Sequence, residues 1–191
     1  MAFGEHPEKE AWSWMGTLRG DPLVPRAKFV RPLGKAGYGL ESGLVGELNL
    51  LARMGLPIAE GILLTHEFHR EFMEMSGLLQ ALQASKKWFE DARQYALEAS
   101  SRYRSVSIEG ELNRLICDSL IELGASTVVV LSEGTAEGGL KSIPEVRAAV
   151  RGAWLSPEGL ERQIEAVVRG DDPPAWPVLV QRELHRGGDR W

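Results

Sequence analysis

A glycine-rich segment with one lysine is the first place in this sequence where the residue types suggest chemistry. Gly34, Gly37 and Gly39 surround Lys35 within residues 32–39. Backbone amides of glycine turns, together with a lysine, can hold phosphate oxygens, and a nearby helix N-terminus adds a favourable dipole. The spacing is not that of the phosphate loop of nucleotide hydrolases, so an ordinary surface loop is the alternative interpretation.

Polar residues that directly follow an apolar segment form a second candidate group. Residues 126–131 read Ser-Thr-Val-Val-Val-Leu, which predicts a buried strand, and Ser132, Glu133, Thr135 and Glu137 come after it. Polar and glycine residues that leave the end of a buried strand are where α/β proteins commonly place ligands. A plain turn between a strand and a helix is the alternative, and the two carboxylates are only a weak indication of a cation site.

The histidines, the cysteine and the tryptophans have structural interpretations that are favoured over chemical ones. His66 and His69 share one face of a predicted helix, but no third ligand at a recognised spacing joins them, so we interpret both as surface or capping residues. Cys117, Trp88 and Trp154 fall on the apolar faces of predicted helices, which favours burial in the core. The sequence therefore predicts no catalytic residue and no metal site.

The composition is that of a folded, acidic chain. The 191 residues are 43% hydrophobic and 26% charged, and the net charge is −5. An acidic chain lacks the basic field that nucleic acid or an anionic membrane requires, so neither is expected as the main partner. The single cysteine, the absence of a signal-peptide pattern and the absence of a membrane-length apolar segment predict a cytoplasmic protein.

A helix, a turn and a strand are predicted in succession near the middle of the first half of the chain. Apolar residues recur at helical spacing over residues 43–54, and Gly55 with Pro57 is a typical helix terminator. Residues 61–65 form a short apolar segment that suits a buried strand. Thr65 at its end is placed to cap a following helix.

The helix after this cap is predicted to face the core with Phe68, Phe72 and Met75. Further helices are predicted at residues 84–100, 108–123, 144–154 and 157–168, and a final strand at residues 177–182. Helices interspersed with short strands indicate an α/β or α+β domain over residues 29–184. A leader at residues 1–28, packing on the domain, and a tail at residues 185–191 flank it.

Three blocks of the sequence resemble, in the correct order, the N-terminal nucleotide-binding domain of phosphoenolpyruvate synthases and pyruvate phosphate dikinases. Residues 43–65 resemble the family's "GGKGANLAELARLGLPVPPGFVIT". Residues 111–137 are similar to its helix and "VAVRSSATAED" segment, and residues 178–182 to its "VLVQRMV" strand. The resemblance implies an ATP-grasp-like N-terminal subdomain with helices packed on a small mixed sheet.

The residues that depart from the family pattern bear on activity. Leu44 stands where the family has its phosphate-binding lysine, and Leu131 stands where it has an arginine. Glu133 replaces a serine and adds negative charge where a polyphosphate would lie, and Gly138 replaces the final acid. The metal-binding acids of the family lie beyond the third block. Because phosphoryl transfer depends on positioning and on Mg²⁺, the resemblance implies a kinase-like ancestry without complete catalytic machinery.

The residues that the resemblance carries over as a nucleotide site are Ser132, Thr135, Glu137 and Gln181, and Lys35 could substitute for the missing lysine. ATP binding is expected to be weak, and Mg²⁺ binding is expected only with a partner chain.

Three functions remain open. The first is a diverged nucleotide-binding domain that acts as a binding or regulatory module. The second is a subunit of a split ATP-dependent phosphotransferase, in which a second polypeptide supplies the metal-binding and phosphohistidine parts and covers an apolar face near residues 178–184. The third is a protein-interaction scaffold without a nucleotide role.

Overall fold

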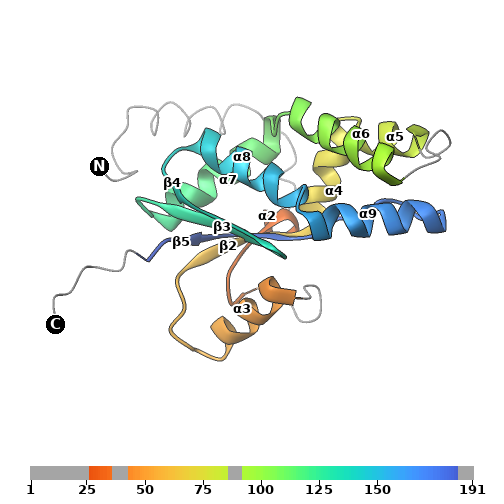
Figure 1. The fold of residues 1–191 in the computed structure, drawn as a ribbon. Coiled ribbons are helices and arrows are strands. Elements are labelled where there is room, and N and C mark those ends of the chain that lie inside the picture. Colours follow the sequence, from red (N-terminus) through yellow and green to blue (C-terminus); the bar gives the residue numbers. More distant parts are fainter. Residues whose placement is uncertain (1–25, 36–42, 86–91, 185–191) are drawn as a thin grey trace.

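One five-stranded sheet lies at the centre of the computed structural model, which describes residues 26–35, 43–85 and 92–184 (Figure 1). The strands are β1 Val30–Pro32, β2 Gly61–Leu64, β3 Val128–Ser132, β4 Thr135–Leu140 and β5 Val178–Arg182. Their order is β1-β2-β5-β3-β4, and every neighbouring pair is antiparallel. Together with the helices, this sheet makes an α+β fold.

The last strand of the chain occupies the middle of the sheet. β5 pairs with β2 on one side and with β3 on the other, and it runs antiparallel to both. β2 and β3 consequently point in the same direction but never pair with each other. The predicted mixed sheet is therefore wrong, because the two strands that share a direction are separated by β5.

The helices form two layers of unequal size. They are α2 Arg26–Phe29, α3 Gly43–Arg53, α4 His66–Met75, α5 Leu78–Ser85, α6 Ala92–Ser105, α7 Gly110–Leu123, α8 Ile143–Trp154 and α9 Pro157–Arg169. Figure 1 shows α7 and α8 over one face of the sheet, with α4 beside them, and α3 over the opposite face. The chain thus encloses its main core on one side of the sheet.

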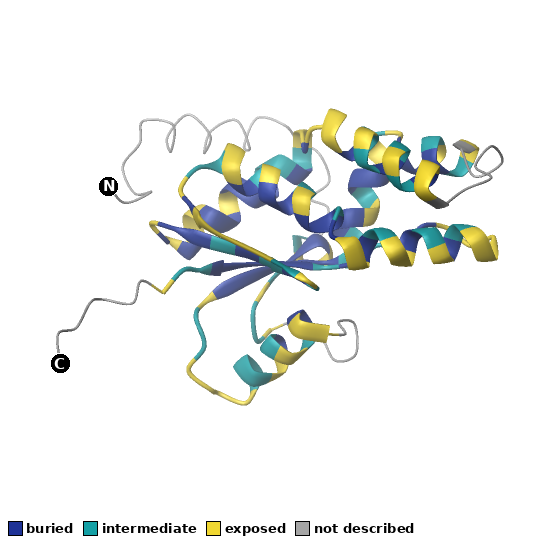
Figure 2. Cartoon of the chain, viewed as in Figure 1, coloured by how far each residue is buried: buried dark blue, intermediate teal, exposed yellow. Residues whose placement is uncertain are grey.

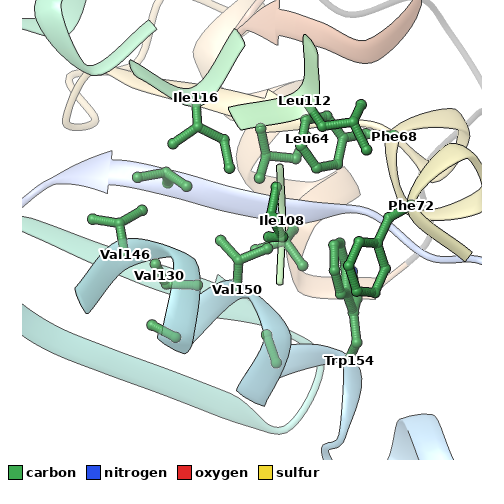
Figure 3. Packing of buried hydrophobic residues seen from close by; sticks show 14 of the residues in the cluster. Leu64, Phe68, Phe72, Ile108, Leu112, Ile116, Val130, Val146, Val150 and Trp154 are labelled. Atoms are coloured by element: carbon green, nitrogen blue, oxygen red, sulfur yellow. The ribbon is translucent and has the colours of Figure 1, made fainter. Parts of the chain in front are cut away.

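The larger hydrophobic core lies between the sheet and the helices α4, α7 and α8. In Figure 3, Val130 of the sheet, Val146 and Val150 of α8, and Phe72 of α4 point into this space together with Trp154. Trp154 is fully buried and stacks on Phe72, with the ring centroids 5.0 Å apart. The predicted core role of Trp154 is confirmed.

The smaller core lies between the sheet and α3. Val45, Leu63 and Leu179 are buried there, and Leu48 and Leu131 pack against them. Side chains alternate between the two faces along a strand. The residues on either side of Leu63 and Leu179 point into the larger core, so Leu63 and Leu179 point to the α3 face. Figure 2 shows α3 as mostly exposed or intermediate. Few buried residues therefore attach α3 to the sheet.

Residues 43–65 form the predicted helix, turn and strand. Gly55 follows α3 with a φ of 77°, a conformation that glycine adopts easily, and β2 comes next. Thr65 caps α4 as predicted, since its Oγ1 accepts a hydrogen bond from the backbone N–H of Phe68 at 3.3 Å. The same hydroxyl donates to the backbone oxygen of Lys28 at 2.7 Å, which ties α4 to the start of the described chain.

Met75, which was predicted to face inward, points outward, and so does Leu44. Met75 is 59% exposed because it is the last residue of α4, where the chain turns towards α5. Met73 is the methionine of α4 that is buried. Leu44 is 42% exposed, since the contact between α3 and the sheet is made by Val45 and Leu48. Phe68 and Phe72 face inward as predicted.

Several predicted boundaries differ from those of the structure. Residues 84–85 end α5 and residues 92–100 lie in α6, and a helix over residues 78–85 was not predicted. Residues 86–91, which include the predicted core residue Trp88, lie outside the described part of the chain. The same holds for residues 1–25 of the predicted leader and for the tail at residues 185–191.

Candidate functional site

A pocket of about 260 Å³ opens where five segments of the chain meet. Its lining residues are Val45, His66, Ser132, Glu133, Arg162, Ala175, Trp176 and Pro177. They belong to the first turns of α3 and α4, the end of β3 with the turn after it, α9, and the segment before β5. The volume is below the roughly 300–1,000 Å³ of pockets that hold drug-sized ligands, so the pocket suits a small ligand.

Ser132 and Thr135 face each other across a tight turn. Ser132 ends β3 and Thr135 begins β4, and the strand register pairs them, which leaves Glu133 and Gly134 as the turn. Gly134 has a φ of 75°. The predicted turn between a strand and a helix is thus a β-hairpin. A two-residue turn with glycine in second place was the signal in the sequence that could have identified it.

The hydroxyl groups of Ser132 and Thr135 have no hydrogen-bond partner among the described residues, although both oxygens are buried. Ser132 is 1% exposed and lines the pocket. An unsatisfied buried polar group costs about 1–3 kcal/mol, so such groups usually contact water or a ligand. Two predicted site residues therefore lie together, and one of them, Ser132, borders a space where a small polar ligand could bind.

Glu133 lies between the two helices that border the hairpin turn. Its carboxylate forms an ion pair with Arg162 of α9 and lies against Gly43, the first residue of α3, where it leaves no room for a side chain. A carboxylate interacts favourably with the positive end of a helix dipole. Glu133 thus places the protein's own negative charge at a helix N-terminus, a position where the anionic group of a ligand could otherwise bind.

α9 contacts the hairpin turn through two residues that are one helical turn apart. Glu158 lies against Gly134, and Arg162 pairs with Glu133. Residues four apart share a helix face, so both side chains reach the turn from α9. Ser156 caps the start of this helix. In Figure 1 the turn between β3 and β4 lies between α9 and α3, which places it between the two helical layers.

Trp176 forms one wall of the pocket and connects it to a buried polar network. Its backbone N–H donates to Nδ1 of His69 at 3.2 Å, which leaves Nε2 of the neutral ring to donate to the Tyr103 hydroxyl at 2.8 Å. The side-chain amide of Gln163 donates to the same hydroxyl at 3.2 Å. That hydroxyl in turn donates to the sulfur of Met73 at 3.2 Å.

The interpretation of His69 as a surface or capping residue is wrong. The side chain is fully buried and stacks on Trp154, with the ring centroids 4.3 Å apart. Burial lowers the pKa of His69 from 6.5 to about 3, so the ring stays neutral over the physiological range. His66 is partly exposed, lies 3.1 Å from the carboxylate of Glu67, and lines the pocket.

Lys35 is attached to the other end of α3. It is exposed, and the preceding residue, Gly34, donates its backbone N–H to Oδ1 of Asn49 at 2.9 Å and lies beside Ala52. At a rise of 1.5 Å per residue, Asn49 and Gly43 are about 9 Å apart along the helix. The backbone at Lys35 therefore does not adjoin the turn between β3 and β4.

Glu137 and Gln181 also lie away from the pocket lining. Glu137 is exposed on β4, opposite Val130. Gln181 lies in β5 and donates its side-chain amide to the backbone oxygen of Ala59 at 2.8 Å, which holds the segment before β2. The five predicted site residues thus separate into the hairpin pair and three residues elsewhere.

Arg162 and Trp176 are pocket residues that sequence reasoning did not identify, and His66 was named only as a surface or capping residue. Each lies in or beside an element that apolar periodicity predicts, but no local pattern distinguishes them from other residues of those elements. They are brought to the hairpin turn by the packing of α9, α4 and the segment before β5.

No protein-family model matches this sequence, and a comparison with curated proteins found no match. Among the helices described above, none is both long and apolar enough to span a membrane. The described ranges also contain no group of three or more His, Cys, Asp or Glu residues that could hold a metal ion.

Proposed function

We propose that the chain is a diverged nucleotide-binding domain, related to that of phosphoenolpyruvate synthases and pyruvate phosphate dikinases and built on an ATP-grasp-like subdomain. It acts as a binding or regulatory module without phosphotransferase activity of its own. The observation that carries the proposal is the carboxylate of Glu133 at the N-terminus of α3, paired with Arg162. A polyphosphate would meet this charge, and two like charges 4 Å apart repel by about 1–4 kcal/mol near a protein surface.

The surroundings of the pocket support the absence of catalysis. Leu44 and Leu131 supply no charge, and Leu131 packs against the smaller core. Lys35 is attached to the far end of α3. Phosphoryl transfer needs cations that neutralise the developing charge, and the pocket lining offers Arg162, which already pairs with Glu133, together with His66. The pocket volume is also small for a whole nucleotide.

Isothermal titration of the full chain with ATP and Mg²⁺ tests the proposal. We expect a dissociation constant weaker than about 1 mM, which corresponds to about −4 kcal/mol, and no phosphorylated product. Micromolar affinity in the wild-type chain would contradict the proposal.

A pair of variants tests the role assigned to Glu133. Glu133→Ser should strengthen ATP binding, because it removes the like charge from the pocket. Glu161→Ser, which removes an exposed carboxylate from α9 next to Arg162, should leave the affinity within about twofold of wild type. Equal affinities in the two variants would count against Glu133 as the limiting residue, and no ATP response in any variant would favour the scaffold interpretation.

A second candidate function is supported by apolar residues on α3 and in the turn after it. Leu44, Leu50, Met54 and Leu56 are 42%, 50%, 68% and 47% exposed. In this proposal the chain is one subunit of a split phosphotransferase, and a second polypeptide covers α3 and supplies the Mg²⁺ ligands and the phosphohistidine domain. The strand residues of β5, near which such a face was expected, are buried apart from the half-buried last one. The exposed apolar face that the second polypeptide would cover is instead that of α3.

Affinity purification of the full chain, followed by mass spectrometry, tests this second candidate. We expect a stoichiometric partner with a phosphohistidine domain, lost in Leu50→Glu and retained in Leu97→Glu, which changes a residue that is 65% exposed on α6. Recovery of the chain alone, or equal behaviour of the two variants, would rule against it. Either function is proposed to operate in the cytoplasm, which cell fractionation can check.

A further inference from the structure

Hydrogen-bond donors from several elements surround the pocket, and one of them has no partner in the protein. The hydroxyl group of Ser132, at the end of β3, lines the pocket, is buried and has no partner among the described residues. The guanidinium of Arg162 enters from α9, and the N-terminus of α3 borders the pocket from the other side. These groups come from three different elements and surround one small space. Donors arranged in this way suit an anion that accepts from several directions.

We propose that this pocket binds the single phosphate group of a small organic phosphate, and that Glu133 occupies the site when no ligand is present. The inference rests on the proposed function, because it assigns a ligand class to the same binding module. A phosphate offers three acceptor oxygens, and Arg162 can contact two of them at once. The Ser132 hydroxyl and the α3 N-terminus can then bind the remaining oxygen.

The size and the walls of the pocket restrict the organic part of the ligand. A volume of about 260 Å³ accommodates a phosphate with a short carbon skeleton, but is small for a base and sugar in addition. Ala175, Trp176 and Pro177 form an apolar wall beside the polar groups. This combination of one charged end and one apolar wall matches a small phosphorylated metabolite.

Glu133 is placed to regulate access because it uses the same partners that the ligand needs. Its carboxylate pairs with Arg162 and lies at the α3 N-terminus. It belongs to a two-residue turn and is partly exposed, with 25% of its side chain accessible, so it can rotate towards solvent. Ligand binding exchanges an ion pair between partly exposed groups for a phosphate contact with the same arginine. The ligand and the Glu133 carboxylate therefore cannot occupy the site at the same time.

Titration of the full chain with inorganic phosphate and with glycerol 3-phosphate, at constant ionic strength, tests the proposal. Binding is followed by calorimetry and by the backbone amide signals of Gly43, Glu133 and Gly134 in NMR spectra. We expect weak binding by the wild-type chain and at least tenfold tighter binding by Glu133→Gln, because the competing charge is removed. Glycerol 3-phosphate should bind more tightly than inorganic phosphate, since it also contacts the apolar wall.

Three further variants serve as controls. Glu161→Gln removes an exposed carboxylate beside Arg162 and should bind phosphate as the wild type does. Two double variants combine Glu133→Gln with Ser132→Ala or with Arg162→Gln. Neither should show the tighter phosphate binding expected of Glu133→Gln alone. Circular dichroism establishes that every variant is folded.

The proposal is overturned if Glu133→Gln binds phosphate no better than Glu161→Gln, or if the gain survives the loss of Arg162. It is also overturned if the amide signals that respond lie away from the hairpin turn and α3. These outcomes leave the proposed function standing, because they concern a single phosphate. Tight ATP binding by the wild-type chain would contradict the proposed function instead.

Discussion

At the scale of single residues, His69 shows how burial determines the chemistry of a titratable group. Both ring nitrogens have partners, since Nδ1 accepts from the backbone of Trp176 and Nε2 contacts the Tyr103 hydroxyl. A neutral ring satisfies this arrangement, and a protonated ring would leave Nδ1–H opposed to another donor. Desolvation accordingly lowers the pKa of His69 to about 3. The residue therefore has a structural role, and it holds the pocket wall formed by Trp176.

The lowered pKa predicts that stability falls on mild acidification. Below pH 6.5 the unfolded chain binds a proton at His69 and the folded chain does not, so the free energy of unfolding decreases as the pH falls. Between pH 7.5 and pH 5 this residue should account for a loss of about 2 kcal/mol. Urea unfolding of His69→Gln should show a smaller loss over this range than wild type. Equal slopes in His69→Gln and the wild type would refute the prediction.

At the scale of elements, α9 owes its position to a glycine that contacts an aromatic ring. Gly159, in the first turn of α9, lies so close to the ring of Trp176 that an added Cβ would overlap it. Gly159 therefore allows α9 to approach the segment before β5. This approach places Arg162 and Glu158 against the hairpin turn. The pocket thus depends on a helix-to-loop contact as much as on its own lining residues.

Two glycine substitutions with the same chemistry should have opposite effects on stability. Gly152 lies in α8, and an added Cβ there meets open space, so Gly152→Ala should raise the free energy of unfolding by about 0.5–1 kcal/mol through helix propensity. Gly159→Ala should lower it by about 1–3 kcal/mol, because the methyl group displaces Trp176. Denaturant unfolding measures both. If both substitutions stabilise the protein, the Trp176 ring moves aside without lowering the free energy of unfolding, and the prediction is wrong.

At the scale of the whole molecule, the sheet separates two layers that are held by very different amounts of buried surface. Residues of six helices contribute to the large core, whereas α3 is attached mainly through Val45, which meets Leu63 and Leu179. Four exposed large apolar residues, Leu44, Leu50, Met54 and Leu56, lie on and just after α3. Regions with few buried contacts open more readily than the rest of a protein. We therefore expect α3 to be the least protected of the described helices around the sheet.

Native-state hydrogen exchange tests this difference with a matched pair of core substitutions. Amides of α3 should exchange faster than those of α7 and α8. Val45→Ala, at a residue 1% exposed, should accelerate exchange chiefly in α3, whereas Val150→Ala, at a residue 0% exposed, should lower the midpoint of global unfolding by several degrees. Uniform acceleration across the sheet in Val45→Ala would contradict the two-layer interpretation.

The sequence by itself determined the elements whose signals act over a few residues. The helix, turn and strand of residues 43–65 follow from apolar spacing and from Gly55, and the cap at Thr65 follows from its hydroxyl. Ser132 and Thr135 were identified as candidates because polar residues follow an apolar strand. The hairpin turn between them also carried a local signal, because its second residue is Gly134.

Only the tertiary structure decided which surfaces meet. The insertion of β5 between β2 and β3 makes the sheet antiparallel, and no local pattern specifies it because strand pairing depends on how all the strands pack together. The same packing buries His69 and separates Lys35 from the hairpin. It also brings Arg162 and Glu133, from different elements, to the N-terminus of α3. The pocket is a product of long-range contacts, so residue types alone could identify some of its members but not their arrangement.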